Sequence, residues 1–208
     1  MSKTFIFDFD GTLVNSASHI RKTFLQITQQ IAPNRLNFAK NIIIGPPLKK
    51  AAIEILGSNE SNLINKFIEN FIKIHDESIL IHTNAYDDAD KTINILSTMG
   101  HKMAIATNKR IVPTLKIIKH YGWYNYFEFI ECSDSELKIV NKTNMIKKII
   151  NKNNEFKKAF FIGDTTNDAI AAENCNLRFI KAAYGYGVKE NWKNIPVYKS
   201  IHSLKELI

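Results

Sequence analysis

Short apolar segments that alternate with helical patterns constrain the fold of this chain more than any other feature. Strand-like runs are predicted over residues 4–8, 103–107, 127–131, 159–163 and 178–182. Apolar residues at helical spacing follow the later runs, around Leu115, Met145 and Ala169. Strands that alternate with helices form a parallel sheet with right-handed crossovers. The sequence therefore predicts an α/β fold.

Polar residues follow three of these runs at the point where each predicted strand ends. They are Asp8, Thr107 and Asp164. In open parallel sheets, ligands bind beyond the carboxyl ends of the strands. We therefore expect one crevice to collect all three side chains.

The segment after the first strand is too long for a crossover in a compact domain. Between about residues 15 and 82 the apolar spacing is helical, as at Phe24, Ile27 and Ile31. The sequence predicts a helical domain over 15–82, inserted into a core domain made of 1–14 and 83–208.

Two carboxylates stand one residue apart at the end of the first strand. A strand directs residues i and i+2 to the same side, so Asp8 and Asp10 can address one reaction centre, and Gly11 allows a sharp turn. Close carboxylates repel unless a cation or a proton intervenes. The pair suggests a divalent metal with a nucleophile and a general acid/base. The alternative is a plain strand end with an Asp-Gly turn.

A second acidic pair follows the run at 159–163. Asp164 and Asp168 are one helical turn apart and offer oxygen ligands suited to Mg²⁺. We interpret Asp164 as a direct ligand and Asp168 as either a ligand or a residue that positions the ligands. Alternatively, Asp168 is an acid that the dipole favours at a helix N-terminus.

These segments resemble the motifs of the haloacid dehalogenase-like (HAD) hydrolase superfamily, in the same order along the chain. Asp8-Phe9-Asp10-Gly11-Thr12 is similar to its Asp-x-Asp-Gly-Thr nucleophile motif. Thr107 matches its second motif, and Gly163-Asp164 with Asp168 matches its fourth. A hydroxyl and backbone N–H groups at Thr107 can bind phosphoryl oxygens, although Thr107 can also simply cap the next helix.

The third HAD motif usually offers a lysine near a helix start, often followed by proline. Lys142 opens a predicted helix, whereas Lys138 precedes it in a presumed loop. Thr143 stands where the proline is expected. We favour Lys142, and the alternative for either residue is a solvated lysine. Asn108, beside Thr107, is a further candidate for substrate binding.

Within the superfamily, the chain most resembles the phosphoglycolate phosphatase-like group. The similar segments are Ile44–Leu48, Ala106–Lys109 and Tyr184–Gly187. The chain departs from this group at Asn15, where many relatives have Asp, and at Asp87-Asp88, which replace Gly-Val. The resemblance implies a Rossmann-like core with an inserted helical cap that closes over the active site.

The resemblance also implies a reaction. Asp8 would attack a phosphate monoester and form an aspartyl-phosphate, and Asp10 would be the general acid/base. Mg²⁺ would be held by Asp8, the Asp10 carbonyl and Asp164, with Asp168 as a further candidate, and Thr107 and Lys142 would stabilise the phosphoryl oxygens. Two alternatives remain open: a phosphomutase of the β-phosphoglucomutase type, and a non-catalytic binding protein on the same fold.

Composition limits the partners. The net charge of +8 over 208 residues is dispersed rather than gathered in a stripe, which favours a small phosphorylated metabolite over nucleic acid. The Gly45-Pro46-Pro47 turn can present backbone N–H groups to an anionic leaving group.

No apolar run approaches the roughly 20 residues that cross a membrane, so we expect a cytoplasmic protein. The two cysteines lack CxxC spacing, and nothing indicates the oligomeric state.

Overall fold

The computed structural model describes residues 2–134 and 140–208 and divides the chain into two compact units. The α/β unit contains residues up to Asn15 and again Asn84–Ile208, and the helical unit contains Ser16–Thr83. The boundaries predicted from the sequence, 14/15 and 82/83, each lie one residue away from these.

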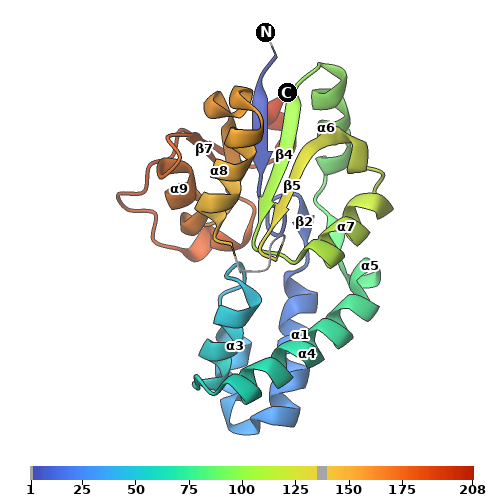
Figure 1. The fold of residues 1–208 in the computed structure, drawn as a ribbon, viewed down its shortest axis with the longest axis vertical. Helices are drawn as coiled ribbons and strands as arrows, with labels where there is room; N and C mark the ends of the chain where they lie inside the picture. The colour runs from blue at the N-terminus through green and yellow to red at the C-terminus, as the bar shows by residue number, and fades with distance from the viewer. Residues whose placement is uncertain (1, 135–139) are drawn as a thin grey trace. The chain divides into compact units, whose positions relative to one another are not determined.

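A parallel six-stranded sheet forms the centre of the α/β unit, in the order β5-β4-β1-β6-β7-β8 (Figure 1). The strands are β1 Thr4–Phe7, β4 Lys102–Thr107, β5 Phe127–Cys132, β6 Phe160–Gly163, β7 Arg178–Ala182 and β8 Lys199–Ile201. Every neighbouring pair in this order is parallel. The predicted α/β class is confirmed, and β8 is a sixth strand that the sequence pattern missed.

Helices cover both faces of the sheet, with α8 and α9 on one face and α6 and α7 on the other (Figure 1). Their bounds are α6 Ala89–Thr98, α7 Ile111–His120, α8 Lys142–Lys152 and α9 Thr166–Glu173. The face of the sheet under α8 and α9 is apolar. Its Ile6 and Phe161 are fully buried in one cluster with Ile146 of α8. The 3₁₀ segments are η2 Tyr124–Tyr126, η3 Asn154–Lys158, η4 Tyr186–Lys189 and η5 Leu204–Leu207.

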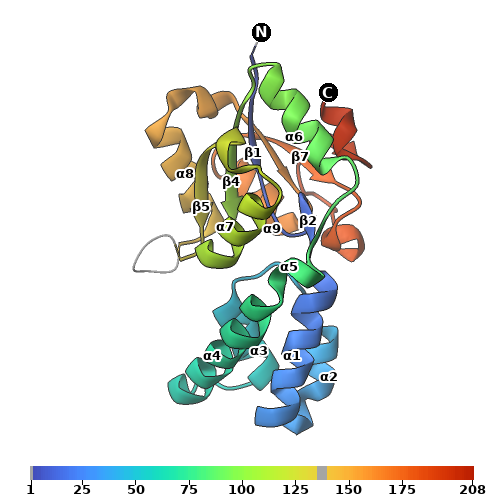
Figure 2. The same ribbon diagram turned by 90° about the vertical axis from the view of Figure 1, so that its right-hand side faces the viewer.

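The helical unit is built from five α-helices with one apolar core. They are α1 Ala17–Ile31, α2 Leu36–Asn41, α3 Leu48–Leu56, α4 Ser61–Glu77 and α5 Ile79–His82, with the 3₁₀ turn η1 Pro33–Arg35 between the first two. Figure 2 shows α1 and α4 side by side, and they meet through Phe24, Phe67 and Phe71. The helical spacing in the sequence is thus the pattern of a buried helix face.

A two-stranded antiparallel ribbon marks where the α/β unit gives way to the helical unit and resumes. Its strands are β2 Val14–Asn15 and β3 Asn84–Ala85, which pair as Val14↔Ala85 and Asn15↔Asn84. Both strands belong to the α/β unit.

No helix among residues 2–134 and 140–208 has the length and apolar character needed to span a bilayer.

Candidate active site at the carboxyl edge of the sheet

The order of the strands brings the predicted site residues to one edge of the sheet. β1 lies between β4 and β6, with Phe7 in register with Ile105 on one side and Ile162 on the other. Asp8 follows β1 and its N–H donates to the Ile162 carbonyl at 2.8 Å. Thr107 ends β4 and Asp164 follows β6. All three therefore lie at the carboxyl ends of adjacent strands, where open sheets bind ligands.

Three carboxylates form the centre of the site. Asp8, Asp164 and Asp168 are all buried, and one oxygen from each lies within 4.8 Å of the others. Burial raises the pKa of Asp8 to about 7, and although Lys142 opposes this, the Asp168 charge adds to it. Burial likewise raises the pKa of Asp164 well above its usual range, together with the Asp168 and Asp8 charges. Buried carboxylates that repel one another favour a bound cation, which would offset their repulsion.

Asp164 has one satisfied oxygen and one orphaned oxygen. Its Oδ2 accepts the backbone N–H of Tyr186 at 2.5 Å. Its Oδ1 is buried and has no hydrogen-bond partner within residues 2–134 and 140–208. A buried polar atom without a partner costs free energy, so this oxygen is suited to a metal ligand.

Both oxygens of Asp168 already have partners. Oδ1 accepts from the Lys142 ammonium at 2.5 Å, and Oδ2 accepts from the Thr165 N–H at 3.0 Å and the Thr165 hydroxyl at 2.7 Å. Thr165 and Asp168 form a capping box at the start of α9. Asp168 therefore lies in the first turn of a helix, as the alternative interpretation expected, and the same side chain also holds Lys142.

Lys142 lies between two acids at the first position of α8. Its ammonium contacts Asp8 Oδ1 at 2.8 Å and Asp168 Oδ1 at 2.5 Å, and its side chain is buried. Burial alone would lower the pKa of Lys142, but the two carboxylates outweigh it and raise the pKa. Lys142 therefore stays charged beside Asp8. The other candidate, Lys138, lies outside the described residues.

Asp10 is held by a lysine that the sequence analysis did not assign to the site. Lys109 Nζ lies 3.0 Å from Asp10 Oδ2 and 3.2 Å from Oδ1, and both side chains are largely buried. The Asp10 carboxylate is not part of the three-carboxylate cluster, and the predicted contact of its backbone carbonyl with a metal stays a prediction. The signal for Lys109 was its place in Thr107-Asn108-Lys109, directly after a strand of the site.

Thr107 and Asn108 follow β4 beside this pair. Thr107 is buried, and its hydroxyl oxygen accepts the Lys109 N–H at 3.2 Å, which leaves its own O–H to donate. Asn108 is half-buried. Thr107 does not cap α7, because the N-cap of that helix is Arg110.

Gly45 belongs to the helical unit, in the loop between α2 and α3. Its φ of 128° lies in the region that favours glycine. Its predicted contact with a leaving group stays a prediction.

Glycines in the late Tyr184–Gly187 segment position Asp164, a role that the sequence analysis missed. A Cβ on Gly185 would lie 2.2 Å from Asp164 Cβ and 2.4 Å from the Gly11 carbonyl oxygen, and one on Gly187 would lie 2.1 Å from the Asp164 carbonyl oxygen. These glycines let the loop approach closely enough for the Tyr186 N–H to hold Asp164 Oδ2. Asp164 Oδ1, which has no hydrogen-bond partner in the described part of the chain, is thereby left for a ligand.

The close approach predicts a specific effect of Gly185→Ala. The φ of Gly185 is −82°, so alanine is strained only by contact with Asp164 and Gly11. We expect unfolding free energy to fall by about 1–3 kcal/mol, the usual cost of overpacking, and Mg²⁺ binding measured by calorimetry to weaken. The control is Gly122→Ala, where φ is 70° and an added Cβ meets nothing within 4 Å. It should lose about 1 kcal/mol of stability yet bind Mg²⁺ normally. Unchanged Mg²⁺ affinity in Gly185→Ala would contradict the positioning role.

Two tyrosines complete the surroundings of the carboxylates. The Tyr86 and Tyr184 rings meet edge to face with centroids 4.8 Å apart, and the Tyr184 hydroxyl donates to the Thr12 carbonyl at 2.9 Å. Burial raises the pKa of Tyr86, as do the Asp164 and Asp10 charges. Tyr86 therefore lies close to the acidic residues as a neutral side chain.

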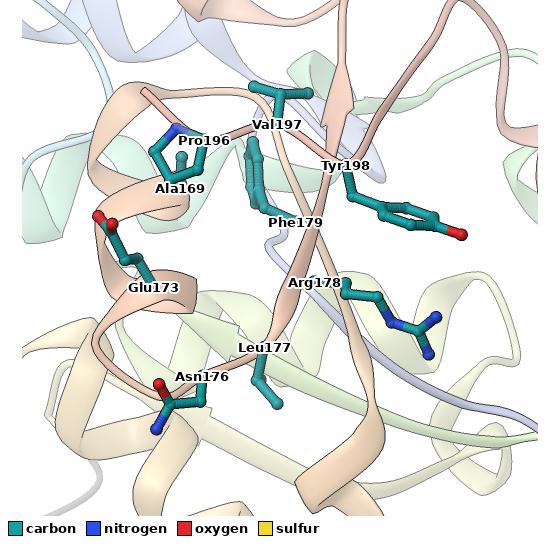
Figure 3. Close-up of a pocket in the computed structure, with 9 residues that line it drawn as sticks. All are labelled: Ala169, Glu173, Asn176, Leu177, Arg178, Phe179, Pro196, Val197 and Tyr198. Carbon is teal, nitrogen blue, oxygen red and sulfur yellow. The ribbon is translucent and has the colours of Figure 1, made fainter. Parts of the chain in front are cut away.

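A cavity of about 420 Å³ lies elsewhere in the α/β unit, beside β7 and α9 (Figure 3). The residues that line it include the apolar Leu177 and Phe179 and the polar Glu173, Arg178 and Tyr198. None of the acidic residues or lysines at the carboxyl edge lines this cavity. This cavity is therefore separate from the cluster of acidic residues.

The donor set at the sheet edge fits a divalent cation. Asp8 and Asp164 supply carboxylate oxygens close together, and Asp164 Oδ1 has no other partner in the described part of the chain. Four carboxylates face two ammonium groups here, counting Asp10, Lys109 and Lys142, and a divalent cation would balance them. Hard oxygen donors of this kind suit Mg²⁺.

Comparison with known proteins identifies the family. The model of the haloacid dehalogenase-like hydrolase family matches residues 5–182, so this chain belongs to that family. A phosphoglycolate phosphatase from Psychrobacter arcticus is 24% identical over 98% of this chain and 93% of its own length. The pyrophosphatase PpaX from Halalkalibacterium halodurans is 24% identical over 89% of this chain and 85% of its own length.

Solved structures agree with this assignment. A protein from Clostridium acetobutylicum, described as a predicted phosphatase, has a TM-score of 0.83 and 28% identity over 100% of this chain and 96% of its own. A haloacid dehalogenase-like family protein from Streptococcus pneumoniae has a TM-score of 0.80 with 17% identity, over 99% and 96% of the two chains, and shows the shared fold. The resemblance and the enzyme class predicted from the sequence are confirmed.

Proposed function

We propose that this protein is a Mg²⁺-dependent phosphatase that hydrolyses a small phosphate monoester through an aspartyl-phosphate on Asp8. The observation that carries the proposal is the buried cluster of Asp8, Asp164 and Asp168 at the sheet edge, with Lys142 against Asp8 and an orphaned oxygen on Asp164. Membership in the hydrolase family and relatives named as phosphatases support it.

Asp8 is the nucleophile in this proposal. A carboxylate oxygen of Asp8 forms a bond to phosphorus while the bond from phosphorus to the leaving oxygen breaks. Asp10 gives a proton to that leaving oxygen and later takes a proton from the water that hydrolyses the aspartyl-phosphate. Free phosphate leaves and Asp8 is regenerated.

Asp8 and Asp164 would hold the Mg²⁺ through their side chains, and Asp10 through its backbone carbonyl. When bound, the cation offsets the negative charges that would otherwise oppose attack on a phosphate. We assign Asp168 to positioning, because both of its oxygens already accept hydrogen bonds, including those from Lys142 and Thr165.

Lys142, Thr107 and Asn108 bind the phosphoryl oxygens. The Lys142 ammonium lies 2.8 Å from Asp8 Oδ1, close to where a phosphoryl group on Asp8 would sit. The Thr107 hydroxyl oxygen accepts the Lys109 N–H, so its O–H can donate to a phosphoryl oxygen, and Asn108 follows it in the same loop. Such donors stabilise charge that develops on the transferred group.

The helical unit acts as the cap that selects the substrate. Its insertion between two parts of the α/β unit and the family resemblance support this role. The backbone N–H of Gly45 is a candidate for contact with the leaving group, since Pro46 and Pro47 carry no N–H. The proposed substrate is a small phosphorylated metabolite, which is supported by relatives named as a phosphoglycolate phosphatase and a pyrophosphatase. We place the reaction in the cytoplasm.

Phosphate release with and without metal tests the proposal. We expect release from a nitrophenyl phosphate that needs Mg²⁺, stops on addition of a chelator and returns with excess Mg²⁺. The panel then includes phosphoglycolate, pyrophosphate, nucleoside monophosphates and sugar phosphates. Isomerised sugar phosphate without free phosphate would instead indicate a phosphomutase, and no turnover of any compound would indicate a binding protein.

A further inference from the structure

We propose that Lys109 is a positioning residue that fixes the acid/base Asp10 through a forked ion pair, so that its main effect is on departure of the leaving group. The inference rests on the proposed function, because it assigns Asp10 its role in the same reaction. Lys109 itself was not among the predicted site residues.

The first argument is the geometry of the contact. Lys109 Nζ lies 3.2 Å from Asp10 Oδ1 and 3.0 Å from Oδ2, so one ammonium spans both carboxylate oxygens. Two simultaneous contacts restrict rotation of the carboxylate more than one contact does. Each carboxylate oxygen has two acceptor positions, so the pair leaves room for a proton to pass to the leaving oxygen.

The second argument is that Lys109 is itself held in place. Its side chain is 5% exposed, and that of Asp10 is 13% exposed. Its N–H donates to the Thr107 hydroxyl oxygen at 3.2 Å, and its carbonyl accepts the Ser133 N–H at 3.3 Å. The anchor for Asp10 therefore comes from the ends of β4 and β5, and Thr107 belongs to the site.

The third argument is that two buried lysines contact different carboxylates of the site. Lys142 contacts Asp8 and Asp168, on the nucleophile side of the site. Lys109 contacts Asp10, which acts on the leaving oxygen. Precise placement of catalytic groups accounts for a large part of enzymatic rate, so loosening Asp10 should slow the step in which it acts.

The test compares two aryl phosphates of nearly the same shape. Phenyl phosphate has a poor leaving group that needs a proton, whereas a nitrophenyl phosphate has a good one that needs little help. We expect Lys109→Met to lower kcat for phenyl phosphate about 10²-fold, with a loss about tenfold smaller for nitrophenyl phosphate and little change in KM. Lys109→Arg should recover much of the loss, because a guanidinium also spans a carboxylate.

A double-mutant cycle with Asp10→Asn completes the test. If Lys109 acts through Asp10, then Lys109→Met costs little more once Asp10 is replaced. Lys152→Met is the matched control, since Lys152, the last residue of α8, pairs with the buried Glu131 of the same unit at 2.7 Å and is not a proposed site residue. It should leave kcat unchanged for both compounds.

Three outcomes would overturn the proposal. Equal losses for the two aryl phosphates would show a general structural role, and a higher KM at constant kcat would show direct substrate binding. Additive effects with Asp10→Asn would remove the link between the two residues. Failure of the proposed function is distinct, because the wild-type protein would then release no phosphate from either compound.

Discussion

Asp8→Asn is expected to abolish Mg²⁺-dependent phosphate release while leaving the protein folded. The amide cannot attack phosphorus as a carboxylate does, so we expect a loss of about 10⁴-fold or more in kcat. The substitution keeps the size of the side chain at the end of β1, where Asp8 is buried. Phosphate release from a nitrophenyl phosphate measures the loss, and circular dichroism with thermal unfolding measures the fold.

The control is Asp87→Asn, an exposed acid in the same unit. It should retain wild-type turnover and the same melting temperature. Turnover in purified Asp8→Asn near the wild-type level would show that Asp8 is not the nucleophile.

Lys142→Met should affect both stability and rate. Lys142 is buried between Asp8 and Asp168, and its removal leaves two carboxylates without their cation. We expect the unfolding free energy of the metal-free protein to fall by about 3 kcal/mol at neutral pH, as when one partner of a buried ion pair is removed. Loss of a charged donor to the phosphoryl oxygens should lower kcat by about 10²–10³-fold. Chemical denaturation and phosphate release measure the two effects.

Lys148→Met provides the comparison for Lys142. Lys148 pairs with the buried Glu131 at 3.0 Å, but its side chain is 33% exposed and lies outside the site. We expect Lys148→Met to lower the unfolding free energy by less than Lys142→Met does and to leave kcat unchanged. Equal effects of the two substitutions on stability and rate would contradict the special role of Lys142.

The sequence predicted the sheet and the acidic cluster because both depend on local patterns. Runs such as 159–163 are apolar enough to be buried strands, and Asp8, Thr107 and Asp164 mark the ends of three of them. Once the strands are parallel neighbours, Asp8 and Asp164 must meet at the carboxyl edge. The strand β8 was missed because Lys-Ser-Ile is short and mostly polar, and it is held by pairing with β7.

The remaining parts of the site depend on contacts between distant residues. Lys109 meets Asp10 only because β4 lies beside β1, and its sequence neighbours do not indicate an ion pair. Gly185 approaches Asp164 through the packing of a loop, and a glycine alone does not reveal what it packs against. The place of Asp168 in the first turn of a helix was foreseen as an alternative, but its capping box with Thr165 and its contact with Lys142 were not.

The short ribbon of β2 and β3 has a consequence for how this protein can diversify. Val14 pairs with Ala85 and Asn15 with Asn84, so the chain leaves the α/β unit and returns to it at adjacent points. An insertion whose ends are adjacent can be exchanged, shortened or replaced by a hairpin turn without altering the register of the sheet. The inserted helices can therefore change in length or sequence while the acidic cluster at the end of the parallel sheet keeps its place.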